Sequence, residues 1–359
     1  MAKIISNRTI IFEQPPLILG GAAVAGDKES KGPLGKLFNQ IFTDDSLDTD
    51  SYEKAEMEFQ RAALRKAAEK SQVPIAELNM IFAGDLLNQC AASAYAISGF
   101  DIPYLGQYGA CSTMAQALLL AAITCDSGAA KTAACITSSH FCTAERQYRM
   151  PIVYGGQRTP TSQWTVTGAG CCIIGAADAD NFGEISLTHN EQPIQKKPKH
   201  PFAVKIASGI FGKILDYGIA DAANMGAAMA PAAADTFLTF FKNTNTTPAD
   251  YDTIYTGDLG ETGSKLLYEL MTDDGFDISK NHQDCGLLIF DKTEQDVHSG
   301  GSGAGCSSAV LGAYILPRLQ SGGERNILFM ATGALMSPTV VLQGENIPCV
   351  AHLLNIVAE

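Results

Sequence analysis

The sequence repeats one order of features at a spacing of about half its length. A short apolar run ends in Gly-Asp-Leu at 84–86, and a second apolar run ends in the same three residues at 257–259. After each run comes a cysteine between small residues, Cys111 in the first half and Cys306 in the second. Each cysteine opens a helical pattern, which a further strand-like apolar run follows. A period this long excludes solenoid repeats of roughly 20–50 residues and indicates two related α/β units.

This duplication predicts that the chain consists of two halves of similar fold. We expect a first half over residues 1–180 and a second half over residues 181–359. Alternating strands and helices in both halves predict a layered sandwich in which helices pack between two sheets. With 46% hydrophobic and 18% charged residues among 359, the chain can bury a core of that size.

Charge and cysteine usage exclude several classes of function. The net charge is −13, which opposes nonspecific binding to nucleic acid and docking on an anionic membrane through a basic patch. The ten cysteines include no Cys-x-x-Cys metal spacing, so we expect reduced thiols in a cytosol-like compartment. The N-terminus, MAKIISNRTI, has no apolar stretch typical of a signal peptide. No apolar run reaches the roughly 18–20 residues of a transmembrane segment.

Cys111 has the surroundings of a nucleophile. Ser112 and Thr113 favour a helix start, and apolar residues follow from Met114 at helical spacing. A thiol in the first turn of a helix lies at the positive end of the helix dipole, which lowers its pKa and favours the thiolate. The alternative is a small core residue on a packed helix, since free cysteines are among the most buried residue types.

The duplicated halves, Ala110-Cys111-Ser112 at the nucleophile position and a Gly168-Ala169-Gly170 turn together resemble the thiolase superfamily of thiolases and 3-ketoacyl-ACP synthases. The resemblance covers nearly the whole chain. It implies an α/β fold, a five-layered αβαβα sandwich made of two pseudo-repeated halves. It also implies a homodimer, since members of the superfamily usually dimerise.

Three further motifs narrow the resemblance: Gly-Asp-Leu in both halves, the Ala- and Met-rich segment at 216–237, and HSGGSGAGCSSAV at 298–310. With them the chain resembles the stage V sporulation protein AD family of spore-forming bacteria. That resemblance implies binding of dipicolinic acid (pyridine-2,6-dicarboxylate), free or as its calcium chelate, for uptake into the developing spore. It implies a cleft derived from a thiolase active site and no cofactor. It also implies other stage V sporulation membrane proteins of the same operon as partners, and a place peripheral to the spore inner membrane or forespore membrane.

The machinery for condensation is incomplete in the sequence. Cys111 fits the nucleophile, and His298 stands where thiolases have Gly-His-Pro, although its neighbours differ. The second thiolase cysteine is replaced within Ala331-Thr332-Gly333, and Asp258 stands where the synthases have a histidine. Loss of a proton-transferring group costs a factor of roughly 10²–10⁴. We therefore expect a retained cleft without condensation activity; the alternative is an active acyltransferase with an acyl group on Cys111 and His298 as base.

Backbone groups from both halves are candidates to hold a small dianion in this cleft. The start of the first-half helix, with the N–H groups of Cys111, Ser112 and Thr113, offers donors to one carboxylate. The glycine run 300–305, which includes Gly301, offers a second, pseudo-symmetric set. We therefore expect two anion sites that face one cleft and suit a ligand with a carboxylate at each end.

Charged side chains near strand ends complete the predicted site. His140, Arg146 and Arg149 follow a strand end, and a guanidinium group clamps a carboxylate in bidentate fashion. Asp85 and Asp258 would orient these cations or help to hold calcium.

Each of these side chains also has a purely structural alternative. His140 would then be a loop histidine with its hydrogen bonds satisfied. Arg146 would form local ion pairs in a solvated turn. Asp85 and Asp258 would cap the helices that follow their strands, and the glycine run would serve helix packing alone.

Overall fold

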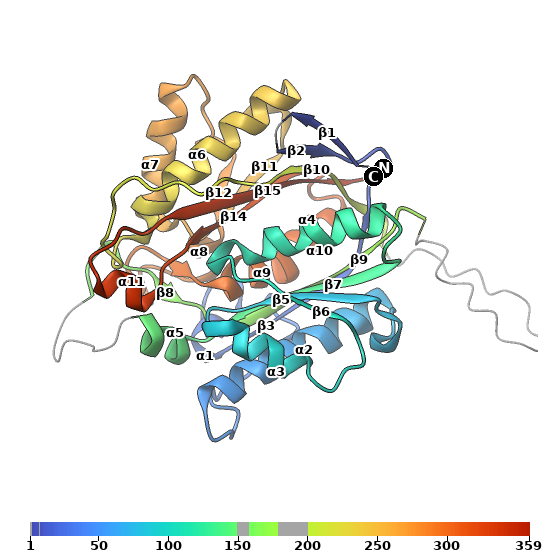
Figure 1. Cartoon of the computed structure of the whole chain (residues 1–359), viewed down its shortest axis with the longest axis horizontal. Coiled ribbons are helices and arrows are strands. Elements are labelled where there is room, and N and C mark those ends of the chain that lie inside the picture. Colours follow the sequence, from blue (N-terminus) through green and yellow to red (C-terminus); the bar gives the residue numbers. More distant parts are fainter. Residues whose placement is uncertain (1, 7, 149–157, 179–199) are drawn as a thin grey trace, which may run out of the picture.

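The strands of both halves form one continuous path (Figure 1) in a computed structural model that describes residues 2–6, 8–148, 158–178 and 200–359. The first-half strands, in sheet order, are β6 (Tyr104–Gly106), β5 (Met80–Gly84), β7 (Thr132–Ser139), β9 (Gly168–Gly175) and β3 (Leu17–Ala25). The second-half strands are β12 (His282–Asp284), β11 (Thr253–Gly257), β14 (Asn326–Ala334), β15 (Cys349–Ala358) and β10 (Val204–Ile210). The two sets meet where Lys205 of β10 pairs with Leu17 of β3.

The duplication inferred from the sequence is visible in how these strands pair. In the first half β5 pairs in parallel with β6 and β7, and β9 is antiparallel to β7 and β3. In the second half β11 pairs in parallel with β12 and β14, and β15 is antiparallel to β14 and β10. The order and direction therefore match strand for strand. The boundary expected between residues 180 and 181 lies outside the described residues.

Helices cover both sets of strands and fill the space between them (Figure 1). The outer layers hold α2 (Tyr52–Ser71) and α3 (Ala91–Ile97) in the first half, and α6 (Met225–Thr244) and α7 (Gly260–Asp273) in the second. The middle layer holds α4 (Thr113–Asp126), α9 (Ala304–Val310), the π-turn η7 (Leu311–Ile315) and α10 (Leu316–Ser321). This is the five-layered αβαβα arrangement that the resemblance implied.

The middle helices are apolar nearly all round because strands lie on both sides of them. Most side chains of α4 are buried, among them Met114, Leu118 and Leu119 at 0% exposure. Such a helix is typical of a protein interior, since a helix at the surface keeps a polar face. The large core cluster of the protein contains α4 and α9 together.

A polar cap and close glycine packing shape the two long outer helices. Ser51 caps α2, its Oγ accepting a hydrogen bond of 3.3 Å from the backbone N–H of Lys54. The Ala-rich segment packs closely against its neighbours, because a Cβ on Gly226 of α6 would lie 2.5 Å from the Leu259 carbonyl oxygen. A Cβ at that distance would clash with the oxygen, so this position requires glycine.

The predicted turn at Gly168-Ala169-Gly170 is wrong. These residues belong to strand β9, which pairs with β3 and β7. A Cβ on Gly170 would lie 2.2 Å from the carbonyl oxygen of Ser308 in α9. The glycines therefore allow a middle-layer helix to approach the sheet, a long-range requirement that the local pattern does not reveal.

Short elements complete the described chain. They are β1 (Lys3–Ser6), β2 (Thr9–Ile11), β4 (Gln40–Ile41), β8 (Trp164–Thr165), β13 (Gly301–Ser302), α1 (Asp27–Ser30), α5 (Phe141–Tyr148), α8 (Cys285–Ile289) and α11 (Pro338–Leu342), with the 3₁₀ turns η1 (Gly35–Leu37), η2 (Ile75–Glu77), η3 (Asn88–Cys90), η4 (Ala110–Ser112) and η6 (Pro248–Asp250). Within the part of the chain that the structure describes, none of the helices has both the length and the apolar composition needed to cross a bilayer.

Candidate functional site

Cys111 lies on a strained turn that ends at a cavity. The preceding residue, Ala110, has a φ of 51°, in the left-handed region that non-glycine residues rarely adopt. The η4 turn then leads directly into α4. A Cβ on Gly333 of β14 would lie 2.4 Å from the Gly109 carbonyl oxygen, so β14 packs closely against the turn. The thiol of the first half is thereby held against a strand of the second half.

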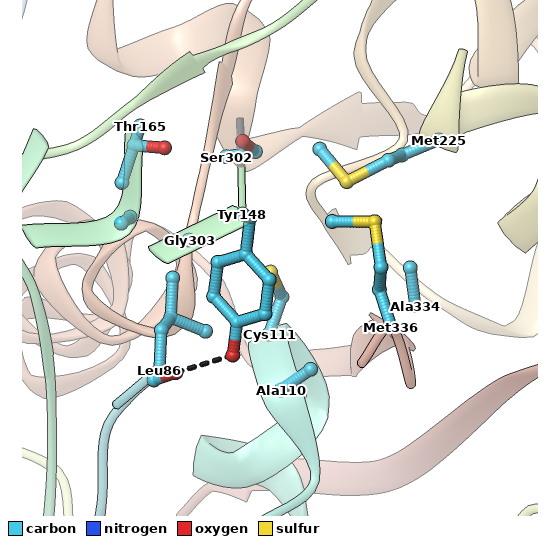
Figure 2. Close-up of a pocket in the computed structure, with 11 residues that line it drawn as sticks. Leu86, Ala110, Cys111, Tyr148, Thr165, Met225, Ser302, Gly303, Ala334 and Met336 are labelled. Carbon is cyan, nitrogen blue, oxygen red and sulfur yellow. Dashed lines mark hydrogen bonds between the residues drawn. The ribbon is translucent and has the colours of Figure 1, made fainter. Parts of the chain in front are cut away.

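The cavity beside Cys111 draws its walls from both halves (Figure 2). It is lined by Leu86, Ala110, Cys111, Ala144, Tyr148, Thr165, Met225, Ser302, Gly303, Ala334 and Met336. The centres of water-sized spheres can occupy about 40 Å³ of it, enough for a few ordered waters. Among the described residues its lining carries no charged side chain; the walls are mainly apolar, with hydroxyl groups from Thr165 and Ser302.

Asp258 lies next to the thiol and adds to the effect of burial on its acidity. Its backbone has a φ of 76°, and its Oδ2 accepts a hydrogen bond of 2.9 Å from the N–H of Gly303. The thiols of Cys111 and Cys306 both interact with this carboxyl group. Burial, and then the charge of Asp284, raise the pKa of Asp258 well above its ordinary value.

The expectation that Cys111 carries an easily formed thiolate is wrong. Burial raises the pKa of the Cys111 thiol well above its ordinary value, and the charge of Asp258 raises it further. A thiol close to a carboxylate in a water-poor setting resists ionisation, and the helix start does not offset this effect. The residue is at the predicted place, but its surroundings do not activate it.

The two anion sites expected from backbone N–H groups are not formed as predicted. In the first half, the N–H of Ser112 donates to the Gly109 carbonyl at 3.1 Å, and that of Thr113 donates to the Ala110 carbonyl. In the second half, the N–H of Gly303 is bound by Asp258, and that of Gly305 donates to Ser139 Oγ at 3.0 Å. Groups that are already hydrogen-bonded within the protein do not serve as donors to a ligand without losing a partner.

Gly301 and the side chains of Ser112 and Thr113 are also occupied by neighbours. Ser112 Oγ and Thr113 Oγ1 donate to the Gly109 and Ala110 carbonyls at 2.6 Å each. The Gly301 carbonyl accepts from Gln163 at 3.0 Å. None of the three residues is among those that line the cavity in the described structure.

His140 is a satisfied core histidine, which was one of the two alternatives. Its Nδ1 accepts a hydrogen bond of 3.1 Å from the N–H of Cys142, so the ring proton is on Nε2, which donates to the Asp45 carbonyl at 2.9 Å. Burial lowers the pKa of His140, and the ring packs against Tyr52 and Phe59. Both ring nitrogens are therefore engaged away from the cavity.

Arg146 matches its structural alternative, whereas Asp85 has a structural role other than the expected helix cap. Arg146 is exposed on α5 and forms an ion pair with Glu53. Asp85 accepts hydrogen bonds from the N–H of Leu87 at 2.7 Å and from the N–H and Oγ of Ser93 at 2.7 and 2.6 Å, which anchors the loop after β5. Arg149 lies outside the described residues.

His298 does not line the cavity. Its Nε2 lies 3.1 Å from Asp296 Oδ1, and its backbone has a φ of 50°. Four residues later Ser302 and Gly303 reach the cavity instead, through the pairing of Ser302 with Thr165 between β13 and β8. Of the predicted residues, the structure thus brings together Cys111 and Asp258.

Several residues that form the cavity were missed. Met225 and Ser302 lie within segments whose composition had been singled out, so those segments were a usable signal. Tyr148, at the end of the polar helix α5, and Met336, after β14, carry no local sign of a functional role. They reach the cavity because distant segments converge there.

Solved structures share this fold at low sequence identity. The chain matches cerulenin-bound OleA of Xanthomonas campestris with a TM-score of 0.60 and 12% identity, covering 97% of this chain and 98% of that one. It matches 3-oxoacyl-[acyl-carrier-protein] synthase III of Aquifex aeolicus VF5 with a TM-score of 0.54 and 11% identity, covering 96% of this chain and all 100% of that one. At such identities the likeness establishes the thiolase-like fold and nothing of the chemistry.

Sequence comparison reaches a narrower result. Stage V sporulation protein AD of Bacillus subtilis (strain 168) is 39% identical over 350 residues, which cover 98% of this chain and 96% of that protein. The sequence model of stage V sporulation protein AD (SpoVAD) matches residues 6–357. That span includes the Cys111 turn, Asp258 and the walls of the cavity. The chain belongs to the stage V sporulation protein AD family.

Proposed function

We propose that this sporulation protein binds dipicolinic acid in the cavity beside Cys111, for uptake of the ligand into the developing spore. The observation that carries the proposal is a retained cavity whose thiol is not activated. Cys111 lines the cavity, and burial, with the charge of Asp258 in addition, raises the pKa of its thiol. A cavity of this kind suits reversible binding better than covalent catalysis.

The walls support a small planar ligand. Leu86, Ala144 and the two methionines supply apolar surface for a ring, and the hydroxyl groups of Thr165 and Ser302 supply hydrogen bonds. Moving a free dianion from water into such walls is costly unless its charge is compensated. We therefore favour the calcium chelate of dipicolinate, in which the metal neutralises the two carboxylates, over the free dianion.

Isothermal titration with dipicolinate, with and without one equivalent of calcium, tests this proposal. We expect saturable binding that is tighter with calcium and weaker by about tenfold in Ala144→Leu, which adds bulk to the cavity wall. Ala76→Leu, at an exposed position of η2, is the matched control and leaves the affinity unchanged. Absence of binding by the folded wild type would overturn the proposal.

The competing function is acyl transfer through Cys111. Incubation with acyl-CoA followed by intact-protein mass spectrometry distinguishes the two, with Cys111→Ala as the control. We expect no acyl adduct on the wild type, because the raised thiol pKa leaves little thiolate near neutral pH. An adduct that Cys111→Ala abolishes would favour the acyltransferase.

We further propose that the protein is a homodimer held at the spore inner membrane or forespore membrane by other stage V sporulation membrane proteins. Family membership and the acidic net charge of −13 support attachment through proteins rather than anionic lipid. Sedimentation of the pure protein tests the dimer. Retention on membranes from cells that lack the other operon products tests the attachment, which should be lost.

A further inference from the structure

We propose that Tyr148 determines which ligands fit beside Cys111, by forming a rigid wall that admits one planar ring and excludes larger groups. The tyrosine is the last residue of α5, and its ring lines the cavity. Figure 2 shows the ring between Leu86 on one side and the thioether groups of Met225 and Met336 on the other. This inference deepens the proposed function and rests on it for the identity of the ligand.

Tyr148 is fixed in place by the loop after β5. Its hydroxyl group donates a hydrogen bond to the carbonyl oxygen of Leu86, drawn as a dashed line in Figure 2. Burial is the main cause that raises the pKa of Tyr148 above its ordinary value, so the hydroxyl keeps the proton that it donates. A side chain with two χ angles and an anchored end has little freedom to move aside.

The neighbouring residue strengthens the same attachment. Gln147 Nε2 donates to the Leu86 carbonyl at 2.8 Å, and Gln147 Oε1 accepts from the N–H of Asn88 at 3.1 Å. Tyr108 reaches the loop from the other side, with its hydroxyl 3.2 Å from Asn88 Oδ1 and 3.5 Å from the Tyr148 hydroxyl. The end of α5 and the loop at 86–88 therefore form one hydrogen-bonded wall.

The loop needs this attachment because its own conformation is unfavourable. Gln89 and Cys90 have φ values of 63° and 50°, both in the left-handed region. Such residues persist where surrounding contacts hold them. Beyond the Tyr148 ring, the opposite wall consists of two methionines, whose flexible thioethers adapt to a bound group. One rigid aromatic wall facing an adaptable one forms a slot for a flat ring.

The ratio of affinities for a small and a large ligand shows whether Tyr148 acts as a wall of the cavity or only stabilises the fold. Dipicolinate is compared with a two-ring dicarboxylate, each titrated with calcium. We expect the wild type to prefer the single ring, and Tyr148→Ala to reduce that preference by about tenfold, within the range of shape discrimination by an apolar pocket. Tyr148→Phe keeps the ring and loses the hydrogen bond that fixes it, so it should reduce the preference less, by about threefold. Tyr108→Ala, which disturbs the loop without removing the wall, is the matched control and keeps the preference.

A second measurement does not depend on dipicolinate. Alkylation of Cys111 by iodoacetamide and by a bulky aryl maleimide is followed by mass spectrometry in a Cys142→Ala background, since Cys142 is the half-buried cysteine among the other nine. Tyr148→Ala should speed the maleimide about tenfold more than iodoacetamide. If that shift appears and dipicolinate does not bind, the proposed function fails and the wall stands. Equal loss for every ligand and equal rates for both reagents would overturn the role of Tyr148.

Discussion

Two copies of one motif have diverged in their surroundings. Cys111 and Cys306 each follow small residues at a helix start, but Cys111 lines the cavity at 7% exposure, whereas Cys306 is buried at 0%. Both thiols interact with the single carboxyl group of Asp258. The first copy therefore contributes a side chain to the cavity, and the second contributes packing beneath it.

The two Gly-Asp-Leu motifs differ in the same way. Asp85 uses its carboxyl group to hold the loop after β5, through hydrogen bonds from Leu87 and Ser93. Asp258 adopts a positive φ, and its carboxyl group lies beside the two thiols. The duplication thus explains the fold, and the departures from symmetry explain the cavity.

The largest expected effect is a difference in unfolding free energy between variants of the two aspartates, Asp85 and Asp258. Asp85→Ala leaves three buried donors without an acceptor, which should cost about 3–5 kcal/mol of unfolding free energy. Asp258→Ala removes one such hydrogen bond and relieves the repulsion with Asp284, so its cost should be about 1 kcal/mol. Urea unfolding of both variants measures the difference. Equal costs would mean that the aspartates still play equivalent roles.

Buried acids in the two halves should give different pH dependence. Glu56 in the first half has a pKa raised from 4.5 to about 8 by burial and by Asp85. In the second half, burial raises the pKa of Asp284 from 3.8 to about 6, and hydrogen bonds from the Thr256 hydroxyl and from backbone N–H groups limit that rise. An acid with a raised pKa stabilises the fold most at low pH, and that contribution is lost as the pH rises through the folded pKa.

Between about pH 6 and 8 the loss of stability should therefore come from Glu56 rather than from Asp284, together with a contribution from Asp258 of the second half, whose pKa is also raised. Burial also raises the pKa of Glu29 to about 8, so this residue likewise lowers the unfolding free energy as the pH rises. Glu56→Gln should remove on the order of 2 kcal/mol of the fall in unfolding free energy over this interval. Glu29→Gln should remove a similar part. A profile that neither variant flattens would contradict the assignment.

The thiols of Cys111 and Cys306 should differ in their reactivity towards alkylating reagents. Burial is the main cause of the raised pKa of Cys111 and persists in Asp258→Asn, but the variant removes the added effect of the Asp258 charge, so alkylation of Cys111 near pH 8 should be faster by at most about tenfold. Cys306 should stay unmodified because it is fully buried. Asp101→Asn, at an exposed position, is the control and should leave the rate at Cys111 unchanged. Peptide mapping after a timed reaction with iodoacetamide measures all three.

Much of this molecule is predictable from local pattern. The duplicated halves and the helix that follows Cys111 are evident from residue order and spacing, and the cleft beside this cysteine follows from the family resemblance. The acidity of Cys111 is not predictable in this way, because it depends first on burial and then on Asp258, and tertiary packing produces both.

The other failures have the same origin. N–H groups that were expected to bind an anion donate hydrogen bonds within the η4 turn and to Asp258 instead. Tyr148 lines the cavity although it belongs to a polar helix. Gly170 allows close contact with α9, a helix more than a hundred residues later in the chain. Each depends on tertiary contacts, which periodicity and motif spacing do not encode.

The smallest expected effect compares the long outer helices of the two halves. At the start of α2, Ser51 Oγ accepts a hydrogen bond from the N–H of Lys54, whereas Asn224 at the start of α6 makes no such bond from its side chain. Ser51→Ala should therefore lower the unfolding free energy by about 1 kcal/mol, and Asn224→Ala should change it by less than about 0.5 kcal/mol. Urea unfolding near neutral pH resolves this difference if the slope of the transition is the same in both variants. Equal losses would show that α6 depends on its first residue as α2 does. Packing of Gly226 against Leu259 and Gly263 would then not suffice to hold the start of α6.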